Sequence, residues 1–123
     1  MKIAFGEATL RPKSFGDLKI YVDGTGGEGF NALVVILGAG KKHPRKKVIG
    51  PARLYFVISG CGNFFIDGKT YVAQARDLFV IKPGQEYSYE AGATGSLQLF
   101  EVNIASAEGS FDDELVEPAG EEE

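Results

Sequence analysis

The 123-residue sequence contains one cysteine, one histidine and no tryptophan. The lone Cys61 excludes an internal disulfide, and the lone His43 excludes a metal site built from several histidines. No apolar run approaches the roughly 20 residues with which a helix crosses a bilayer. The first residues, MKIAFGEATL, lack the apolar core of a signal peptide. These absences favour a cytoplasmic protein without a membrane partner.

Basic residues are absent after Lys82. Residues 1–82 hold all 13 Lys and Arg and six acids, whereas residues 83–123 hold the other eleven acids. The densest basic segment, KKHPRKK at residues 41–47, is interpreted as a solvated loop that attracts anionic ligands or the acidic C-terminal segment. It lacks the interleaved aromatic residues of a nucleic-acid patch, and the chain is acidic overall, so no nucleic-acid partner is expected.

The C-terminal segment, residues 106–123, has eight acids and few apolar residues. This composition is typical of a disordered, solvated segment. A single helical turn near residues 112–116 is the one regular element expected there, and any order is expected to come from contact with the basic loop. We therefore predict one domain over residues 1–105 and an acidic tail over residues 106–123.

Amphipathic helical periodicity is also absent, and short segments rich in Val, Ile, Phe and Tyr take its place. We expect residues 1–17 to be irregular and strands to cover residues 18–22, 30–37, 54–58, 64–66, 78–81 and 97–104. The corners between them include Gly60-Cys61-Gly62, Asp67-Gly68 and Lys82-Pro83-Gly84. Gly and Pro supply the backbone angles of tight turns. The pattern predicts an all-β jelly roll or barrel.

From Gly40 onward the sequence resembles the cupin family. The first cupin motif runs Gly, five residues, His-x-His, three or four residues, Glu, six residues, Gly, and Gly40 and Gly60 match its ends. The second motif runs Gly, five residues, Pro-x-Gly, two residues, His, and DLFVIKPGQEY at residues 77–87 matches it in outline. The resemblance covers residues 30–104 and implies the cupin-like double-stranded β-helix, a jelly-roll barrel.

The positions that hold the metal ligands of a cupin carry other residues here. Lys46 and Val48 stand at the two His positions of the first motif, Arg53 at its Glu position and Tyr87 at the His position of the second motif. Two of these side chains are cations, which repel a divalent ion. We therefore expect no metal ligands and no cofactor.

Arg53 begins a strand, and its planar guanidinium suits a carboxylate or phosphate. Inside a barrel it needs an anionic partner, because an unpaired buried charge is very costly. Arg53 and Lys46 then hold a ligand anion, or Arg53 forms an internal ion pair with Glu86, Glu101 or an acid of the tail.

Tyr87 and Tyr89 lie on one face of a strand, because strand side chains alternate. Together with Tyr55 they form either a hydroxyl-bearing wall of a ligand pocket or a plain barrel filling in which each hydroxyl is hydrogen-bonded. In the first case Tyr87 is the candidate catalytic acid or base, since the charge of Arg53 favours the phenolate.

His43 and Cys61 are given structural interpretations. The basic neighbours of His43 favour an exposed loop histidine over a metal ligand that acts with Cys61 or Glu86. Cys61 lies between two glycines without an adjacent base, which favours an incidental cysteine over a nucleophile.

Two functions stay open from the sequence. The first is a metal-free cupin that binds a small anionic metabolite of the sugar or organic-acid type, with or without activity as a metal-independent isomerase, epimerase or lyase. The second is a non-catalytic dimerisation or ligand-sensing module, such as the similar cupin domains of centromere proteins. A homodimer is expected in either case, because alternation puts Leu54, Phe56 and Ile58 on an outward apolar face that monomers seldom expose.

Overall fold

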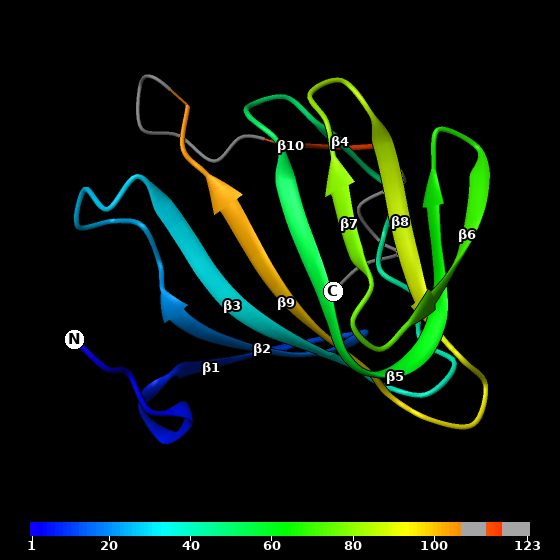
Figure 1. Ribbon diagram of the computed structural model, residues 1–123, viewed down its shortest axis with the longest axis horizontal. Coiled ribbons are helices and arrows are strands. Elements are labelled where there is room, and N and C mark those ends of the chain that lie inside the picture. Colours follow the sequence, from blue (N-terminus) through cyan, green and yellow to red (C-terminus); the bar gives the residue numbers. More distant parts are fainter. Residues whose placement is uncertain (107–112, 117–123) are drawn as a thin grey trace.

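The computed structural model describes residues 1–106 and 113–116, which are almost entirely β-structure (Figure 1). In chain order the elements are the short 3-10 helix η1 (Phe5–Glu7) and the strands β1 (Thr9–Lys13), β2 (Gly16–Val22), β3 (Phe30–Leu37), β4 (Lys46–Val48), β5 (Arg53–Ile66), β6 (Lys69–Gln74), β7 (Leu78–Ile81), β8 (Glu86–Ala91), β9 (Leu97–Ile104) and β10 (Asp113–Leu115). No helix in this described part is long and apolar enough to cross a membrane. The cytoplasmic location stays a prediction.

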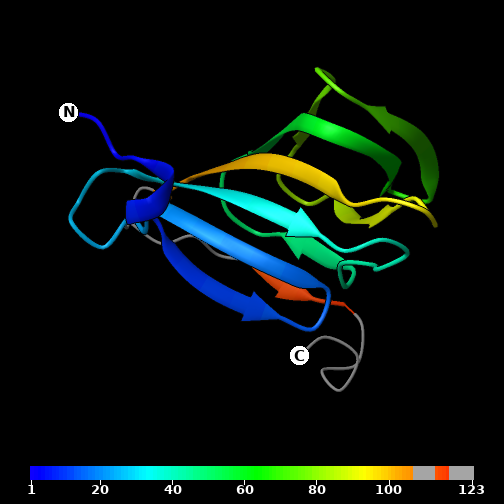
Figure 2. The same cartoon turned by 90° about the horizontal axis from the view of Figure 1, so that it is seen from below.

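Two antiparallel sheets face each other and share the long strand β5 (Figures 1 and 2). The first sheet has the order β1-β2-β3-β9-β5-β7. The second has the order β6-β5-β8-β4-β10. The predicted all-β jelly-roll fold is confirmed.

β5 passes from one sheet to the other at Gly60-Cys61-Gly62. Its first half pairs with β7 and β9, and its second half pairs with β6 and β8. The tight turn between two separate strands expected at these three residues is therefore wrong, because the chain continues as one 14-residue strand. A Cβ atom at Gly60 would collide with the Ser96 carbonyl oxygen, and one at Gly62 with the Glu90 carbonyl oxygen. The missing side chains allow the close backbone approach that turns this corner.

The Asp67-Gly68 hairpin is observed between β5 and β6. Both residues have positive φ, 49° and 80°, as a two-residue hairpin turn requires.

Both ends of the described chain contain strands that were not expected. Residues 9–13 form β1, which tolerates Pro12 because it pairs on one side only, with β2. At the other end, the expected helical turn near residues 112–116 is wrong. Residues 113–115 instead form β10 against β4, and the Val116 amide donates to the Arg45 carbonyl. β10 lies beyond the boundary at residue 105 that the sequence suggested.

The hydrophobic core lies between the inner faces of the two sheets. The inward rows of β3, β5, β8 and β9 fill it with large fully buried side chains, among them Leu37, Tyr55, Phe64, Tyr89 and Leu99. Such alternation is what a strand with one buried face requires.

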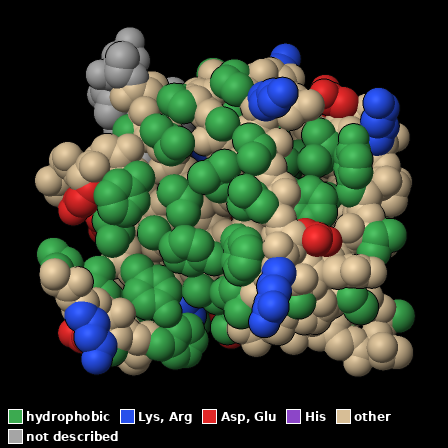
Figure 3. Space-filling view, in the orientation of Figure 1, with side chains coloured by type: hydrophobic (Ala, Val, Ile, Leu, Met, Phe, Trp, Pro, Cys, Tyr) green, Lys and Arg blue, Asp and Glu red, His purple; other side chains and the backbone are tan. Residues whose placement is uncertain are grey.

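The outer face of the first sheet is apolar and partly exposed over β3, β9, β5 and β7. The outward rows of β3, β9, β5 and β7 contain no charged residue, and Figure 3 shows their hydrophobic side chains gathered over these strands. Phe56 and Ile58 are 40% and 43% exposed, while Arg53, Tyr55 and Val57 are buried. The predicted alternation along the start of β5 is therefore present.

Candidate functional site

A cavity of about 140 Å³ opens between the inner faces of the two sheets. Its walls come from β1, β2, β3, β5 and β9 on one side and from β4, β8 and the loop before β4 on the other. All five residues proposed from the sequence as ligand-binding contribute to it: Lys46, Arg53, Tyr55, Tyr87 and Tyr89. We call this space the cationic cavity, because Arg11 and Lys13 also line it.

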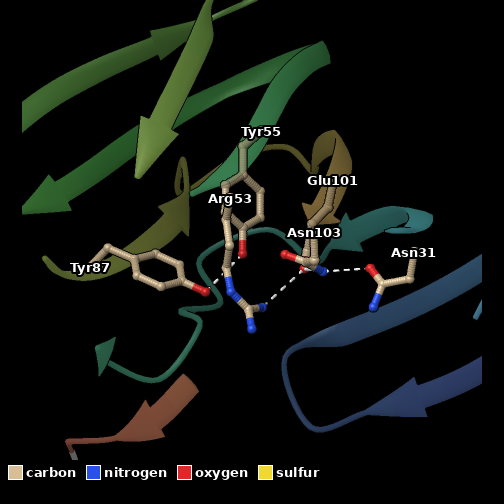
Figure 4. Close-up of polar contacts among 6 residues, drawn as sticks. All are labelled: Asn31, Arg53, Tyr55, Tyr87, Glu101 and Asn103. Carbon is tan, nitrogen blue, oxygen red and sulfur yellow. Dashed lines mark hydrogen bonds and ion pairs between the residues drawn. The ribbon is translucent and has the colours of Figure 1, made fainter. Parts of the chain in front are cut away.

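A chain of polar contacts leads from Arg53 on the cavity wall to Asn31 on β3 (Figure 4). Arg53 Nη1 lies 3.7 Å from Glu101 Oε2, and both side chains are about one-tenth exposed. Asn103 Nδ2 donates to the same Glu101 oxygen and to Asn31 Oδ1, each at 2.7 Å. The internal ion pair with Glu101, one of the two alternatives for Arg53, is therefore present, and Arg53 also faces the cavity.

The tyrosines form a buried aromatic wall. The hydroxyls of Tyr55 and Tyr87 share a hydrogen bond of 2.9 Å. Burial, reinforced by the negative charge of Glu101, raises the pKa of Tyr55 and of Tyr89 well above the ordinary tyrosine value. Both therefore stay protonated at neutral pH, and their hydroxyls serve as hydrogen-bonding groups.

His43 is buried, so the expectation of an exposed loop histidine is wrong. Its backbone amide donates to the Tyr89 carbonyl and directs the imidazole inward, where it stacks on the Tyr89 ring at 4.4 Å between centroids. The imidazole also makes an edge contact with the Phe15 ring, at 5.2 Å between centroids. Burial and the charges of Lys46, Arg53 and Lys13 lower the pKa of His43 from 6.5 to about 3. The imidazole is therefore neutral.

Sequence reasoning considered Glu101 only as a partner and missed Asn103 altogether. Both lie on the face of β9 that also presents the fully buried Leu97 and Leu99. An apolar row of period two that turns polar at its end predicts polar groups inside the barrel. This signal was available in the sequence.

Residues 40–117 match the family model of the AraC-like ligand-binding domain. The match spans more than half of the 123-residue chain. The chain belongs to this family. No curated protein matches the sequence.

Solved structures share the fold of this AraC-like domain at low sequence identity. The polyketide cyclase RemF from Streptomyces resistomycificus superposes with a TM-score of 0.78 and 11% identity, covering 97% of this chain and 87% of that one. A predicted oxalate decarboxylase from Thermotoga maritima superposes with a TM-score of 0.73 and 19% identity, covering 85% of this chain and 98% of that one. The Cnp3 cupin domain of Schizosaccharomyces pombe superposes with a TM-score of 0.68 and 18% identity, covering 82% of this chain and 71% of that one. The predicted cupin family membership is confirmed.

The residues at the metal-ligand positions of the cupin motifs do not fit a metal ion in this AraC-like domain. Lys46, Arg53 and Tyr87 meet in the cationic cavity, and Val48 is fully buried in the core. Two cations, a phenol and an alkyl group offer no carboxylate, imidazole or thiolate. Among residues 1–106 and 113–116, no three His, Cys, Asp or Glu side chains gather as a metal site would need.

Cys61 is exposed on β5 at the sheet corner. It is not among the residues that line the cationic cavity. The structure therefore gives it no part in the candidate site.

Proposed function

We propose that this AraC-like domain binds a small anionic metabolite, of the sugar or organic-acid type, inside its barrel and without a metal ion. The observation that carries the proposal is the charge of the cavity wall. Four cationic side chains line it, Arg11, Lys13, Lys46 and Arg53, against one carboxylate, Glu101. A partly enclosed cavity with this balance attracts anions.

The behaviour of His43 supports a positive potential inside the cavity. Three of the wall cations, Lys46, Arg53 and Lys13, each contribute to the lowered pKa of the imidazole, after the larger effect of burial. A potential that disfavours a proton on His43 favours a negative charge on a ligand at the same place.

The size of the cavity limits the ligand. Its volume of about 140 Å³ is small, since pockets for drug-sized ligands begin at about 300 Å³. A compact acid suits this space better than an extended cofactor.

Catalysis is a finer proposal that depends on Tyr87. Its hydroxyl meets that of Tyr55 inside the same cavity, where it is placed to exchange a proton with a bound metabolite. The fold does not decide between enzyme and binding module, because the neighbours named above include a polyketide cyclase and a cupin domain. If the domain is an isomerase, epimerase or lyase, Tyr87→Phe should abolish turnover and leave acid binding measurable.

Isothermal titration with a panel of small organic and sugar acids tests the proposal. The wild type should bind at least one acid and no neutral sugar. Lys46→Met should weaken binding at least tenfold, about 1.4 kcal/mol. Lys47→Met is the matched control, since Lys47 is the neighbour of Lys46 on β4 and is not among the cavity-lining residues. Absence of binding to every acid, or equal losses in both variants, would contradict a specific anion site.

The absence of a metal is a separate prediction. Elemental analysis of protein purified without chelator should find no stoichiometric iron, zinc, nickel or manganese. About one such ion per chain, lost in His43→Ala, would contradict the assignment of the ligand positions.

A further inference from the structure

A second cavity, open to solvent, adjoins the cationic cavity and differs from it in chemistry. It measures about 190 Å³ and shares Arg11, Leu18, Leu33 and Glu101 with the first. Its remaining polar wall consists of Asp23, Asn31 and Asn103. We call it the amide cavity. A ligand that spans both cavities meets cations at one end and amide and carboxylate groups at the other.

Asn103 lines the amide cavity and carries an unsatisfied acceptor. Its Nδ2 donates to two acceptors, Glu101 Oε2 and Asn31 Oδ1, which fixes the orientation of the amide. Its Oδ1 is buried and has no hydrogen-bond partner among the described residues, and the whole residue is only 4% exposed. A buried acceptor of this kind is unfavourable unless a donor reaches it.

The surroundings favour a hydroxyl over an ammonium as that donor. Glu101 already faces the guanidinium of Arg53 at 3.7 Å and accepts from Asn103. Asp23 accepts from the backbone amide and the hydroxyl of Thr25 within its own loop. Both carboxylates therefore already have hydrogen-bond or ion-pair partners, and the positive charge of Arg53 repels a ligand ammonium.

We propose that the metabolite is a hydroxy acid, with its carboxylate beside Arg53 and Lys46 and a hydroxyl donating to Asn103 Oδ1. This inference rests on the proposed function and makes Asn103 the residue that determines specificity. A site built to accept a hydrogen bond rejects an analogue that lacks the hydroxyl, because the buried acceptor is then left unpaired.

Three six-carbon acids test the inference in isothermal titrations at constant salt: gluconate, hexanoate and 6-aminohexanoate. Gluconate should bind at least tenfold more tightly than hexanoate and than 6-aminohexanoate. Equal affinity for hexanoate would overturn the hydroxy-acid inference and leave the proposed function standing. Tightest binding of 6-aminohexanoate would also overturn it, since the donor would then be an ammonium. Binding of none of the three acids would overturn the hydroxy-acid inference, and absence of binding to every acid of the larger panel would overturn the proposed function as well.

Asn103→Leu supplies the second arm. It should abolish the preference for gluconate over hexanoate. Gln98→Leu is the control, because Gln98 lies on the opposite face of the same strand and should keep the preference. A preference that persists in Asn103→Leu would overturn the role of Asn103. If Asn103→Leu does not fold, the comparison of the three acids on the wild type still decides the ligand class.

Discussion

Arg53 unites two roles that the sequence presented as alternatives. It lines the cationic cavity, and it also faces Glu101 at 3.7 Å. The pair is nearly buried, so each charge helps to compensate the other in a poorly solvated place. An arginine that is oriented by an internal carboxylate is held in place before a ligand arrives, which lowers the entropy cost of binding.

Replacing Arg53 with methionine should therefore be destabilising. Arg53→Met removes the guanidinium that faces the nearly buried Glu101 carboxylate, and breaking a buried ion pair costs on the order of 3–5 kcal/mol. The double variant Arg53→Met, Glu101→Gln removes both charges and should recover most of that loss without restoring acid binding. Urea unfolding followed by circular dichroism measures both. A loss below about 1 kcal/mol in the single variant would show that the ion pair contributes little, as exposed pairs do.

His43 should make the fold sensitive to acid. Its pKa is about 3 in the folded state and 6.5 as the ordinary value, so between these limits the unfolded chain binds a proton that the folded chain does not. The contribution of His43 to the unfolding free energy is complete above pH 6.5. It decreases by about 1.4 kcal/mol for each unit by which the pH is lowered below that value. At pH 5 the loss should reach about 2 kcal/mol.

The variant His43→Phe isolates this effect. Phenylalanine keeps the stacking on Tyr89 and cannot be protonated. The difference in unfolding free energy between variant and wild type, measured at pH 8 and pH 5, should shift by about 2 kcal/mol in favour of the variant at pH 5. Identical pH dependence in the two proteins would mean that the folded state accommodates the imidazolium.

At the scale of elements, the corner in β5 depends on the absence of a side chain. Gly60 has a φ of 84°, and a Cβ atom there would collide with the Ser96 carbonyl oxygen. Gly60→Ala should therefore destabilise the fold by several times the cost of a left-handed alanine alone, which is about 1–2 kcal/mol.

Gly40→Ala is the matched control. Gly40 has a φ of 70°, and no atom lies within 4 Å of a Cβ built there. Thermal unfolding should show a small decrease for Gly40→Ala and a large one, or insoluble protein, for Gly60→Ala. Equal decreases would show that backbone conformation, and not the close approach to Ser96, determines the corner.

The same elements show what the sequence was able to predict. Short apolar segments located β3 and β9, and strand alternation predicted the inward set of β5, because burial of one face imposes a period of two. The role of Gly60-Cys61-Gly62 was misread, since a sheet corner and a hairpin both require glycine. Neither β10 nor buried His43 was predicted, because both depend on partners distant in sequence, β4 and the Tyr89 ring. Lys46, Arg53 and Tyr87 were found by their motif positions and Tyr89 by strand alternation. The inward place of Asn103 on β9 could have been predicted in the same way, whereas its contacts with Glu101 and Asn31 needed the structure.

At the scale of the whole molecule, the outer face of the first sheet is left without a cover among the described residues. The N-terminal segment reaches only its margin, where the Phe5 ring contacts Tyr21 at 6.4 Å and lies below the Lys19 ammonium. The outward rows of β3, β9, β5 and β7 include exposed side chains, such as Leu78 at 56% and Val80 at 42%, although Ala32 and Val34 of β3 are buried. Because these rows carry no charge, two copies of the face can meet without like-charge repulsion.

We propose that a second copy of the chain covers this face in a two-fold homodimer. Light scattering at micromolar concentration should give the mass of two chains, because closed two-fold pairs are the commonest soluble assembly. Phe56→Glu should give monomers, since the two-fold axis brings each new carboxylate into a desolvated apolar interface, near its copy. Val72→Glu is the control, because Val72 is 63% exposed on β6, in the other sheet, and should leave the dimer intact. A monomer mass for the wild type, with solubility and stability unchanged in Phe56→Glu, would contradict the proposal and would mean that the apolar face needs no partner in solution.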